Sequence, residues 1–349
     1  MQSAVNFISD GLGLTPSEFA EVLLECTADG AVHTDSYSLG GTVERVEAKF
    51  AQLLGKQRAI FMPTGTLANH MALRGLAGVD RKVIVQAESH IYRDIGDSAQ
   101  TLSGLNLMPL APRRTMFTLQ EVQQAIDSFR DERAATRVGV ISIESLVRRQ
   151  DDAMFDYEEM RRISDFARAQ DIKMHLDGAR LFVEAVHRDI APVEQAALFD
   201  TVFVSLSKCF NSASGAILAG PADFIEDLYH QRRMFGGSLA QAWPQAAVAL
   251  HYADGFLEAY SAAWSAAETL FDLLDEDPAF RVERIPQGTH IVRLHVVDVS
   301  LPEFGERLRQ RQVSIAPPAP DDQWLTLKVN PSILRVSPAQ LVAVFRAAL

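Results

Sequence analysis

Residues 171–180 read DIKMHLDGAR, an apolar, strand-like run that ends on a carboxylate and an arginine. Asp177 follows the run Ile172–His175, and Arg180 stands three positions further on. In an open parallel sheet, ligands bind at the carboxyl ends of the strands, so a carboxylate there is a candidate functional group. The same two residues are also typical of a structural ion pair between Asp177 and Arg180. This stretch alone leaves both interpretations open.

Similar apolar runs lie on both sides of this stretch, with helical patterns between them. In residues 43–55 the apolar positions recur with a helical period, and residues 157–170 and 221–235 show related patterns. This alternation predicts an α/β fold with a mainly parallel sheet covered on both faces. The candidate strands are Lys82–Gln86, Arg137–Glu144, Asp171–Asp177, Asp200–Leu206 and Gly215–Gly220.

The C-terminal third has a different organisation. Residues 239–274 predict one long helical stretch that leads into a second domain. Strand-like patterns at Glu283–His295 and Leu325–Lys328, followed by a helical pattern at Pro338–Leu349, predict a small α+β domain. We therefore expect a large domain over residues 1–250, including an N-terminal arm, and a small domain over residues 251–349.

Composition excludes several classes of protein. The 349 residues are 48% hydrophobic and 22% charged, which excludes a mainly disordered chain. The net charge of −12 argues against nucleic acid or an anionic membrane as the main partner. We find no signal peptide, membrane span or metal-ligand set, and two cysteines do not make a disulfide framework. We expect a soluble cytoplasmic protein.

A second candidate site follows the run Thr201–Leu206, where residues 205–210 read SLSKCF. Most lysines are exposed and serve solubility, but the apolar run before Lys208 indicates burial. Burial lowers the pKa of a lysine and makes it a nucleophile toward aldehydes. The neighbouring Cys209 is expected to pack in the core, because adjacent side chains in extended backbone point apart.

A third candidate site is residues 63–69, PTGTLAN, which follow an apolar run and open a helical pattern. Free N–H groups and the dipole at a helix start favour an anion such as a phosphate, although an ordinary helix cap has the same appearance. Together, a phosphate cradle, the carboxylate of Asp177 and a buried Lys208 are what pyridoxal phosphate requires. The lysine forms a Schiff base, and the carboxylate keeps the pyridine nitrogen protonated.

These motifs, in this order, resemble the threonine aldolase branch of the β-eliminating lyase family of pyridoxal-phosphate enzymes. The resemblance covers most of the chain, and it implies the aspartate-aminotransferase type of fold, called fold type I. The motifs that carry it are LLGK with the following residues to Asn69, ESHIY at 88–92, residues 175–182, Ser207-Lys208 with Gly215–Gly220, and RRMFGG at 232–237.

The resemblance also implies roles for individual residues. Lys208 binds the cofactor aldehyde, Asp177 pairs with the pyridine nitrogen, and His90 stacks on the ring. Arg180 and Ser9 contact the substrate carboxylate. Arg232 reaches the phosphate of a neighbouring subunit, and Tyr37 lies at the same shared site, which implies a homodimer or homotetramer. The phosphate loop is expected to comprise Thr64, Gly65 and Thr66.

The sequence departs from the family pattern around the substrate. After Glu144 the family usually has Asn-Thr-His, whereas this chain continues SLV and then Arg148-Arg149. Near the C-terminus Lys328 stands where an arginine is usual, and lysine lacks the planar two-pronged grip of arginine. Arg148 and Arg149 are either solvated loop residues, or one of them points into the site and helps hold an anionic substrate group.

The expected function is cleavage of a β-hydroxy-α-amino acid, of the L-threonine or L-allo-threonine type, to glycine and an aldehyde. The base at the β-hydroxyl is His90 or a bound water. Alternatives on the same site are β-elimination, transamination or racemisation of another amino acid. A cofactor-binding protein without turnover is a third interpretation, and the intact set of Lys208, Asp177 and His90 argues against it.

Overall fold

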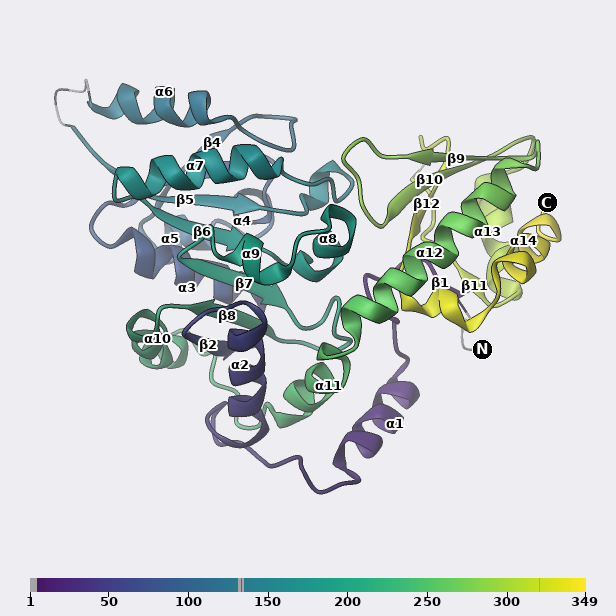
Figure 1. The fold of residues 1–349 in the computed structure, drawn as a ribbon, viewed down its shortest axis with the longest axis horizontal. Coiled ribbons are helices and arrows are strands. Elements are labelled where there is room, and N and C mark those ends of the chain that lie inside the picture. The colour runs from purple at the N-terminus through teal and green to yellow at the C-terminus, as the bar shows by residue number, and fades with distance from the viewer. Residues whose placement is uncertain (1–4, 131–132, 134, 320) are drawn as a thin grey trace.

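A computed structural model describes residues 5–130, 133, 135–319 and 321–349 (Figure 1). Its centre is a seven-stranded sheet in the order β2-β8-β7-β6-β5-β3-β4. Strand β8 is antiparallel to β2 and β7, and the other neighbours are parallel, which confirms the mainly parallel sheet. The strands are Arg58–Met62 (β2), Lys82–Gln86 (β3), Asn106–Leu110 (β4), Val138–Glu144 (β5), Lys173–Asp177 (β6), Thr201–Ser205 (β7) and Ala216–Gly220 (β8).

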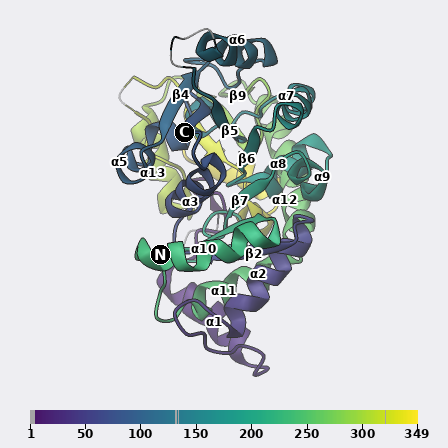
Figure 2. The same ribbon diagram turned by 90° about the vertical axis from the view of Figure 1, so that its left-hand side faces the viewer.

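Helices cover both faces of this sheet, as Figure 2 shows from the side. Every residue of β5, β7 and β8 is buried, because these strands have apolar neighbours above and below. One face carries α2 (Gly41–Leu53), α6 (Leu119–Arg130), α7 (Tyr157–Ala169), α8 (Leu181–Arg188), α9 (Pro192–Ala196) and α11 (Trp243–Ala253). The other carries α3 (Gly65–Ala77), α4 (His90–Arg93), α5 (Ser98–Ser103) and α10 (Ala222–Met234).

The register of the central strands sets up the site. Glu144, the last residue of β5, pairs with Asp177, the last residue of β6, and Asp177 pairs with Phe203 on β7. The carboxyl ends of three adjacent strands therefore lie at one edge of the sheet. The loops that follow them carry Arg148, Arg180 and Lys208, so the topology brings together groups that are far apart in the sequence.

The second part of the chain builds a separate core. A three-stranded antiparallel sheet in the order β12-β10-β9 packs with helices and with a parallel pair, β1 and β11. The elements are β1 (Val5–Asn6), α12 (Phe256–Asp275), β9 (Phe280–Arg284), β10 (Ile291–Val296), α13 (Leu301–Gln310), β11 (Val313–Ser314), β12 (Leu325–Lys328) and α14 (Pro338–Arg346). The small α+β unit expected from the sequence is present.

Three details of this part differ from expectation. The stretch 239–274 is two helices, α11 and α12, separated at Asp254-Gly255, where glycine weakens helix propagation. The run 283–295 holds two strands, because residues 285–290, with Gly288, turn the chain back. Helix α13 was not expected from the sequence.

The N-terminal arm and α12 connect the two cores. Val5 and Phe7 pack in the second core, whereas α1 (Pro16–Thr27) lies against α11 of the first part. The first turn of α12 belongs to the large core and its later turns to the small core. We keep the two-domain division near residue 250 as a proposal, with residues 5–7 assigned by packing to the small unit. Across the described residues, no helix is long and apolar enough to cross a membrane.

Candidate active site

Two cavities meet at Lys208. The first has a volume of about 190 Å³ and lies at the carboxyl ends of β5, β6 and β7. The second, of about 630 Å³, is shared between the N-terminal arm and the loop after β7. Among the residues that line the first are Gly65, Thr66, His90, Asp177, Arg180 and Lys208. Among those that line the second are Ser9, Asp10, Leu14, Phe19, Ser207 and Lys208.

Lys208 has the environment that the sequence predicted. It follows β7 and is largely covered by the chain. Burial, together with the positive charge of Arg180, lowers the pKa of Lys208 below its ordinary value. The lower pKa increases the fraction of Lys208 side chains that are neutral amines, and the neutral amine is the nucleophilic form. Cys209 is buried and its pKa is raised to about 12 by that burial, so its thiol is inert packing.

Asp177 is held by a buried chain of hydrogen bonds. The side-chain amide of Asn69 donates to Oδ2 of Asp177 at 2.7 Å, and its oxygen lies 2.9 Å from Nε2 of His175. Nδ1 of His175 lies 2.8 Å from the hydroxyl of Thr201. Burial lowers the pKa of His175 to about 4, so the ring is neutral near pH 7. The neutral ring donates from Nε2 to Asn69 and accepts from Thr201 at Nδ1.

Glu144 connects Asp177 with His90. Its carboxyl accepts the backbone N–H of His90 at 2.5 Å and that of Arg148 at 3.0 Å. Burial and the charge of Asp177 raise the pKa of Glu144 to about 8. The hydrogen bonds fix the start of α4, so the imidazole of His90 lines the cavity that also holds Asp177 and Lys208.

The start of α3 has the form of an anion cradle. Thr64 is the N-cap, and its hydroxyl accepts the N–H of Leu67 at 3.2 Å. Helical geometry leaves the first-turn N–H groups of Gly65 and Thr66 without partners inside the helix. These two residues line the cavity, whereas Thr64 acts as the cap beneath it. A Cβ at Gly65 would lie 2.4 Å from the ring of Phe203, so a side chain there would displace β7 packing.

Arg180 lies in a buried cluster of charges. Its Nε is 3.0 Å from Oδ1 of Asp10, and its Nη1 is 3.4 Å from Oδ1 of Asp152. Although burial opposes the charged form, Asp152 and Asp10 raise the pKa of Arg180 above its ordinary value. Lys328 contacts the same two carboxylates at 3.2 and 3.7 Å, and His290 contacts them at 3.0 and 3.7 Å. The cluster therefore joins the arm, the large unit and the small sheet.

Of the other residues expected near the substrate, Ser9 lines a cavity at Lys208 and Tyr37 does not. Ser9 lines the larger cavity beside Lys208, and its hydroxyl accepts from the side-chain amide of Asn6 at 3.2 Å. Tyr37 lines neither cavity and is half exposed, with the guanidinium of Arg233 5.0 Å above its ring. The role of Tyr37 at a shared site stays a prediction.

Arg232 is covered by its own chain. Its side chain is 1% exposed and donates to the carbonyls of Phe61 at 2.7 Å and Ser38 at 3.1 Å. The carboxylate of Glu47 lies 4.0 Å away. This geometry gives Arg232 a structural role in the single chain. Its contact with a neighbouring subunit's phosphate stays a prediction.

The two arginines after β5 behave differently. Arg148 lines the cavity that holds Lys208, and Arg149 does not. Arg149 donates to Oδ1 of Asp94 at 2.6 Å, whereas the guanidinium of Arg148 lies 3.8 Å from Oδ2 of the same carboxylate. The structure thus favours Arg148 over Arg149 as the residue that points into the site.

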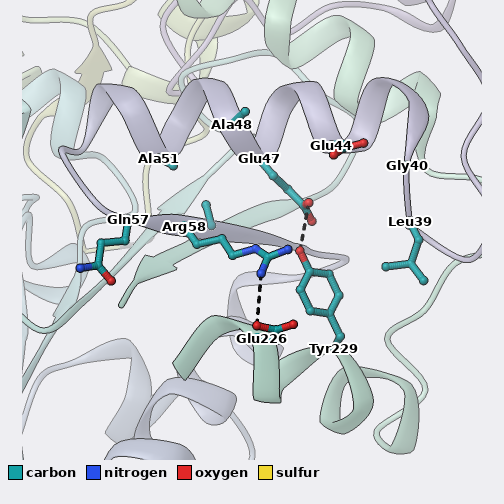
Figure 3. Close-up of a pocket in the computed structure, with 11 residues that line it drawn as sticks. Leu39, Gly40, Glu44, Glu47, Ala48, Ala51, Gln57, Arg58, Glu226 and Tyr229 are labelled. Carbon is teal, nitrogen blue, oxygen red and sulfur yellow. Dashed lines mark hydrogen bonds and ion pairs between the residues drawn. The ribbon is translucent and has the colours of Figure 1, made fainter. Parts of the chain in front are cut away.

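A further cavity, of about 540 Å³, lies away from Lys208 between α2, β2 and α10 (Figure 3). Its charged groups face one another: Arg58 is 3.5 Å from Glu226, and the hydroxyl of Tyr229 donates to Glu47 at 3.3 Å. None of the residues assigned to catalysis lines it. We therefore take the cavities at Lys208 as the candidate active site.

The fold is fold type I, the fold of a large class of pyridoxal-phosphate enzymes. The β-eliminating lyase family model matches residues 17–297, so the chain belongs to that family. It is 30% identical over 244 residues to a low-specificity L-threonine aldolase from Candida albicans. That match covers 69% of this chain and 64% of the relative, less than two thirds of the relative's length.

Two other comparisons bear on fold and function. A solved structure from Listeria monocytogenes, provisionally described as an L-allo-threonine aldolase, has a TM-score of 0.79 and 26% identity. It is matched over 100% of this chain and 97% of its own. An alanine racemase from Cochliobolus carbonum is 30% identical over 203 residues, which is 57% of this chain and 51% of that protein.

The sequence interpretation missed several residues of the site. Asn69, His175 and Thr201 carried no motif by themselves, because a hydrogen-bonded chain across three elements appears only once the sheet register is known. Asp10 stands next to Ser9, and that position was the only available signal for it. Nothing local marked Asp152 or His290, which meet Arg180 through tertiary packing alone.

Proposed function

We propose that this chain is a pyridoxal-phosphate lyase of the threonine-aldolase type. It would cleave a β-hydroxy-α-amino acid, such as L-threonine or L-allo-threonine, into glycine and an aldehyde. The observation that carries the proposal is that Lys208, Asp177 and the first turn of α3 line one cavity. Family membership and the similarity to named L-threonine aldolases support it.

The residues present fit the cofactor. The cavity offers a lysine with a lowered pKa, a carboxylate fixed by a neutral amide, and two first-turn N–H groups at Gly65 and Thr66. Lys208 would hold the aldehyde, Asp177 the pyridine nitrogen, and residues 64–66 the phosphate. His90 lines the same space and would cover one face of the ring. When bound, the cofactor accepts the electron pair of the bond that breaks.

The protein groups bind the substrate and move its protons. The cluster around Arg180 supplies the contact for the α-carboxylate, with Ser9 at the adjoining cavity. Asp177, oriented by its hydrogen bond from Asn69, would hold a proton on the ring nitrogen. The β-hydroxyl proton leaves to His90 or to a bound water, and Lys208 is placed to return a proton at Cα.

We further propose that the protein acts in the cytoplasm and as a homodimer or homotetramer with shared active sites. The acidic surface and the absence of spanning helices among the described residues are consistent with an aqueous location. Exposed Tyr37, Leu39 and Met234 offer an apolar contact for a second copy.

Racemisation is the second candidate. It is favoured by the similarity to the Cochliobolus racemase and by Val147, which stands where the family usually has a histidine. A racemase needs a proton acceptor on each face of the substrate but no base at a β-hydroxyl.

One screen separates these functions. The loaded protein is mixed with L-threonine, L-allo-threonine, phenylserine and L-alanine, and the products are measured. Glycine and aldehyde in equal amounts support the aldolase proposal. Formation of D-alanine without aldehyde would establish the racemase, and ammonia with a keto acid would establish elimination or transamination.

A further inference from the structure

Arg148 presents a charged side chain to the active cavity without a hydrogen-bonded anion. Its backbone N–H is held by Glu144 at 3.0 Å, which fixes the residue at the carboxyl end of β5. Its side chain is 55% exposed and lines the cavity that also contains Lys208 and Asp177. Among the described residues, the nearest carboxylate recorded for its guanidinium is that of Asp94, at 3.8 Å.

Asp94 is already neutralised by another residue. Arg149 donates to it at 2.6 Å, well within hydrogen-bond distance, whereas the contact of Arg148 is too long for a hydrogen bond. The arginines lower the pKa of Asp94 despite its partial burial, so it carries one negative charge near pH 7. One carboxylate faces two guanidinium groups, and this leaves Arg148 with a surplus positive charge.

The positive groups at the other end of the cavity have no such surplus. Arg180 and Lys328 face Asp10 and Asp152, two cations against two anions, with His290 between them. One bound α-carboxylate already makes that end net negative, and it leaves no cation there for a further acid group. A substrate with a second acid group therefore finds its complementary charge at Arg148.

We propose that Arg148 is a specificity-determining residue that binds a second acidic group on the substrate side chain. The substrate class is then the β-hydroxy-α-amino dicarboxylic acids, of which 3-hydroxyaspartate is the smallest. The inference rests on the proposed function and names its substrate. Arg148 comes directly after Val147, which stands where the family usually has a histidine, so this chain has an apolar residue in place of that base and a cation next to it in the sequence.

The chemistry needs no additional reactant. In 3-hydroxyaspartate the Cα–Cβ bond breaks, the β-hydroxyl gives up its proton, and Cα gains one. The products are glycine and glyoxylate, and their atoms sum to those of the substrate. No oxidant or reductant is consumed.

The first experiment measures binding rather than turnover. Cofactor-loaded protein is titrated by calorimetry with L-aspartate and with L-asparagine, which differ only in the charge of the side chain. The wild type should prefer aspartate, and Arg148→Ala should lower the ratio of the two affinities by about 10- to 100-fold, as expected for a charge-assisted contact. Asp94→Asn should raise the ratio, because it removes the competing carboxylate.

Arg93→Gln is the matched control. It removes a neighbouring guanidinium that lines neither cavity and donates to the carbonyl of Ala87 at 2.7 Å. The ratio should stay within about 3-fold of the wild type, since diffuse charge effects are screened. Equal losses in Arg93→Gln and Arg148→Ala, or no preference for aspartate in the wild type, would overturn the role of Arg148.

The second experiment measures kcat/KM for 3-hydroxyaspartate relative to L-threonine. Arg148→Ala should lower that ratio by the same factor as the binding ratio. If neither compound yields glycine but the aspartate preference still depends on Arg148, the proposed aldolase function fails while the binding role stands. If threonine is cleaved and Arg148→Ala leaves both ratios unchanged, the proposed function stands and the role of Arg148 fails.

Discussion

The side-chain amide of Asn69, on α3, donates to Oδ2 of Asp177, on β6, at 2.7 Å. This bond joins the helix that would cradle a phosphate to the strand that would hold the pyridine nitrogen. Behind it, His175 and Thr201 continue the chain, so that every donor is oriented toward Asp177. Such a chain stabilises the buried carboxylate of Asp177 through oriented hydrogen-bond donors.

Asn69→Ala should weaken this stabilisation. The carboxylate of Asp177 loses a hydrogen bond worth about 1.5–3 kcal/mol, so its contact with the ring nitrogen weakens and kcat falls by about 10- to 100-fold. The pH titration of the absorbance of the bound cofactor should shift as well. Thr201→Val, at the far end of the chain, should give the same changes at smaller amplitude. If Asn69→Ala and the wild type had identical pH titrations, the chain would have no electrostatic role.

Borohydride reduction of the loaded protein should place the label on Lys208. Lys56 is the instructive competitor, because burial also lowers its pKa. Its ammonium group, however, donates to the carbonyl of Phe199 and lines neither active cavity. Peptide mapping of the reduced wild type and of Lys208→Ala decides between them. Cofactor retained on Lys56 in the wild type would refute the assignment of Lys208.

Much of the large unit could be predicted because its strands are short, apolar and buried on both faces. The expected runs at 82–86 and 215–220 match β3 and β8 to within a residue, and Asp177 and Lys208 lie at strand ends as expected. The small unit was harder. Its strands are half exposed, and the signals for the turn (Pro286 and Gly288) and for the start of α13 (Ser300 and Pro302) are present in the sequence but were not used.

The burial of Arg232 could not be predicted from the sequence for a different reason. The motif places an arginine near the end of α10, but the direction of its guanidinium depends on the carbonyls of Phe61 and Ser38, which come from distant segments. The charge cluster at Arg180 has the same character. Its five members come from the arm, two loops of the large unit, the turn before β10 and the end of β12.

Glu47 should make stability depend on pH. Burial raises its pKa from the ordinary value of 4.5 to about 7. The folded state therefore holds the proton more tightly than the unfolded state between those values, and the free energy of unfolding falls as pH rises through that window. The full effect is about 3 kcal/mol at most. This stabilising contribution of Glu47 is largest below pH 4.5 and absent above pH 7.

Urea unfolding at pH 5 and pH 8 tests this prediction. Glu47→Gln should reduce the difference in the free energy of unfolding between pH 5 and pH 8. Glutamine does not titrate, but it can still accept the N–H of Phe61. Glu44→Gln, on the exposed side of the same helix, should leave the difference unchanged. A Glu47→Gln protein with the wild-type pH dependence would show that another group is responsible.

Lys328→Ala should act on stability first. The side chain of Lys328 is 22% exposed, and its ammonium group faces Asp10 and Asp152 at 3.2 and 3.7 Å. Removing it leaves the two carboxylates with only Arg180 and His290 of the partners named above for this cluster's acids. We expect a loss of about 1–3 kcal/mol in the free energy of unfolding, less than for a fully buried pair because water reaches the lysine. Lys328→Arg should retain most of the stability.

The pH dependence of that loss identifies its cause. Although burial raises it, the pKa of Asp10 is held well below 3.8 by Arg180, His290 and Lys328. A depressed carboxyl pKa contributes stability that is present above the unfolded value and is lost as pH falls through the folded value. The gap between wild type and Lys328→Ala should therefore be widest above pH 4 and should narrow toward pH 2, as measured by urea unfolding. If Lys328→Ala instead kept full stability at pH 7 and raised KM for L-threonine 10-fold or more, the lysine would bind the substrate carboxylate directly, and the aspartates would not need it.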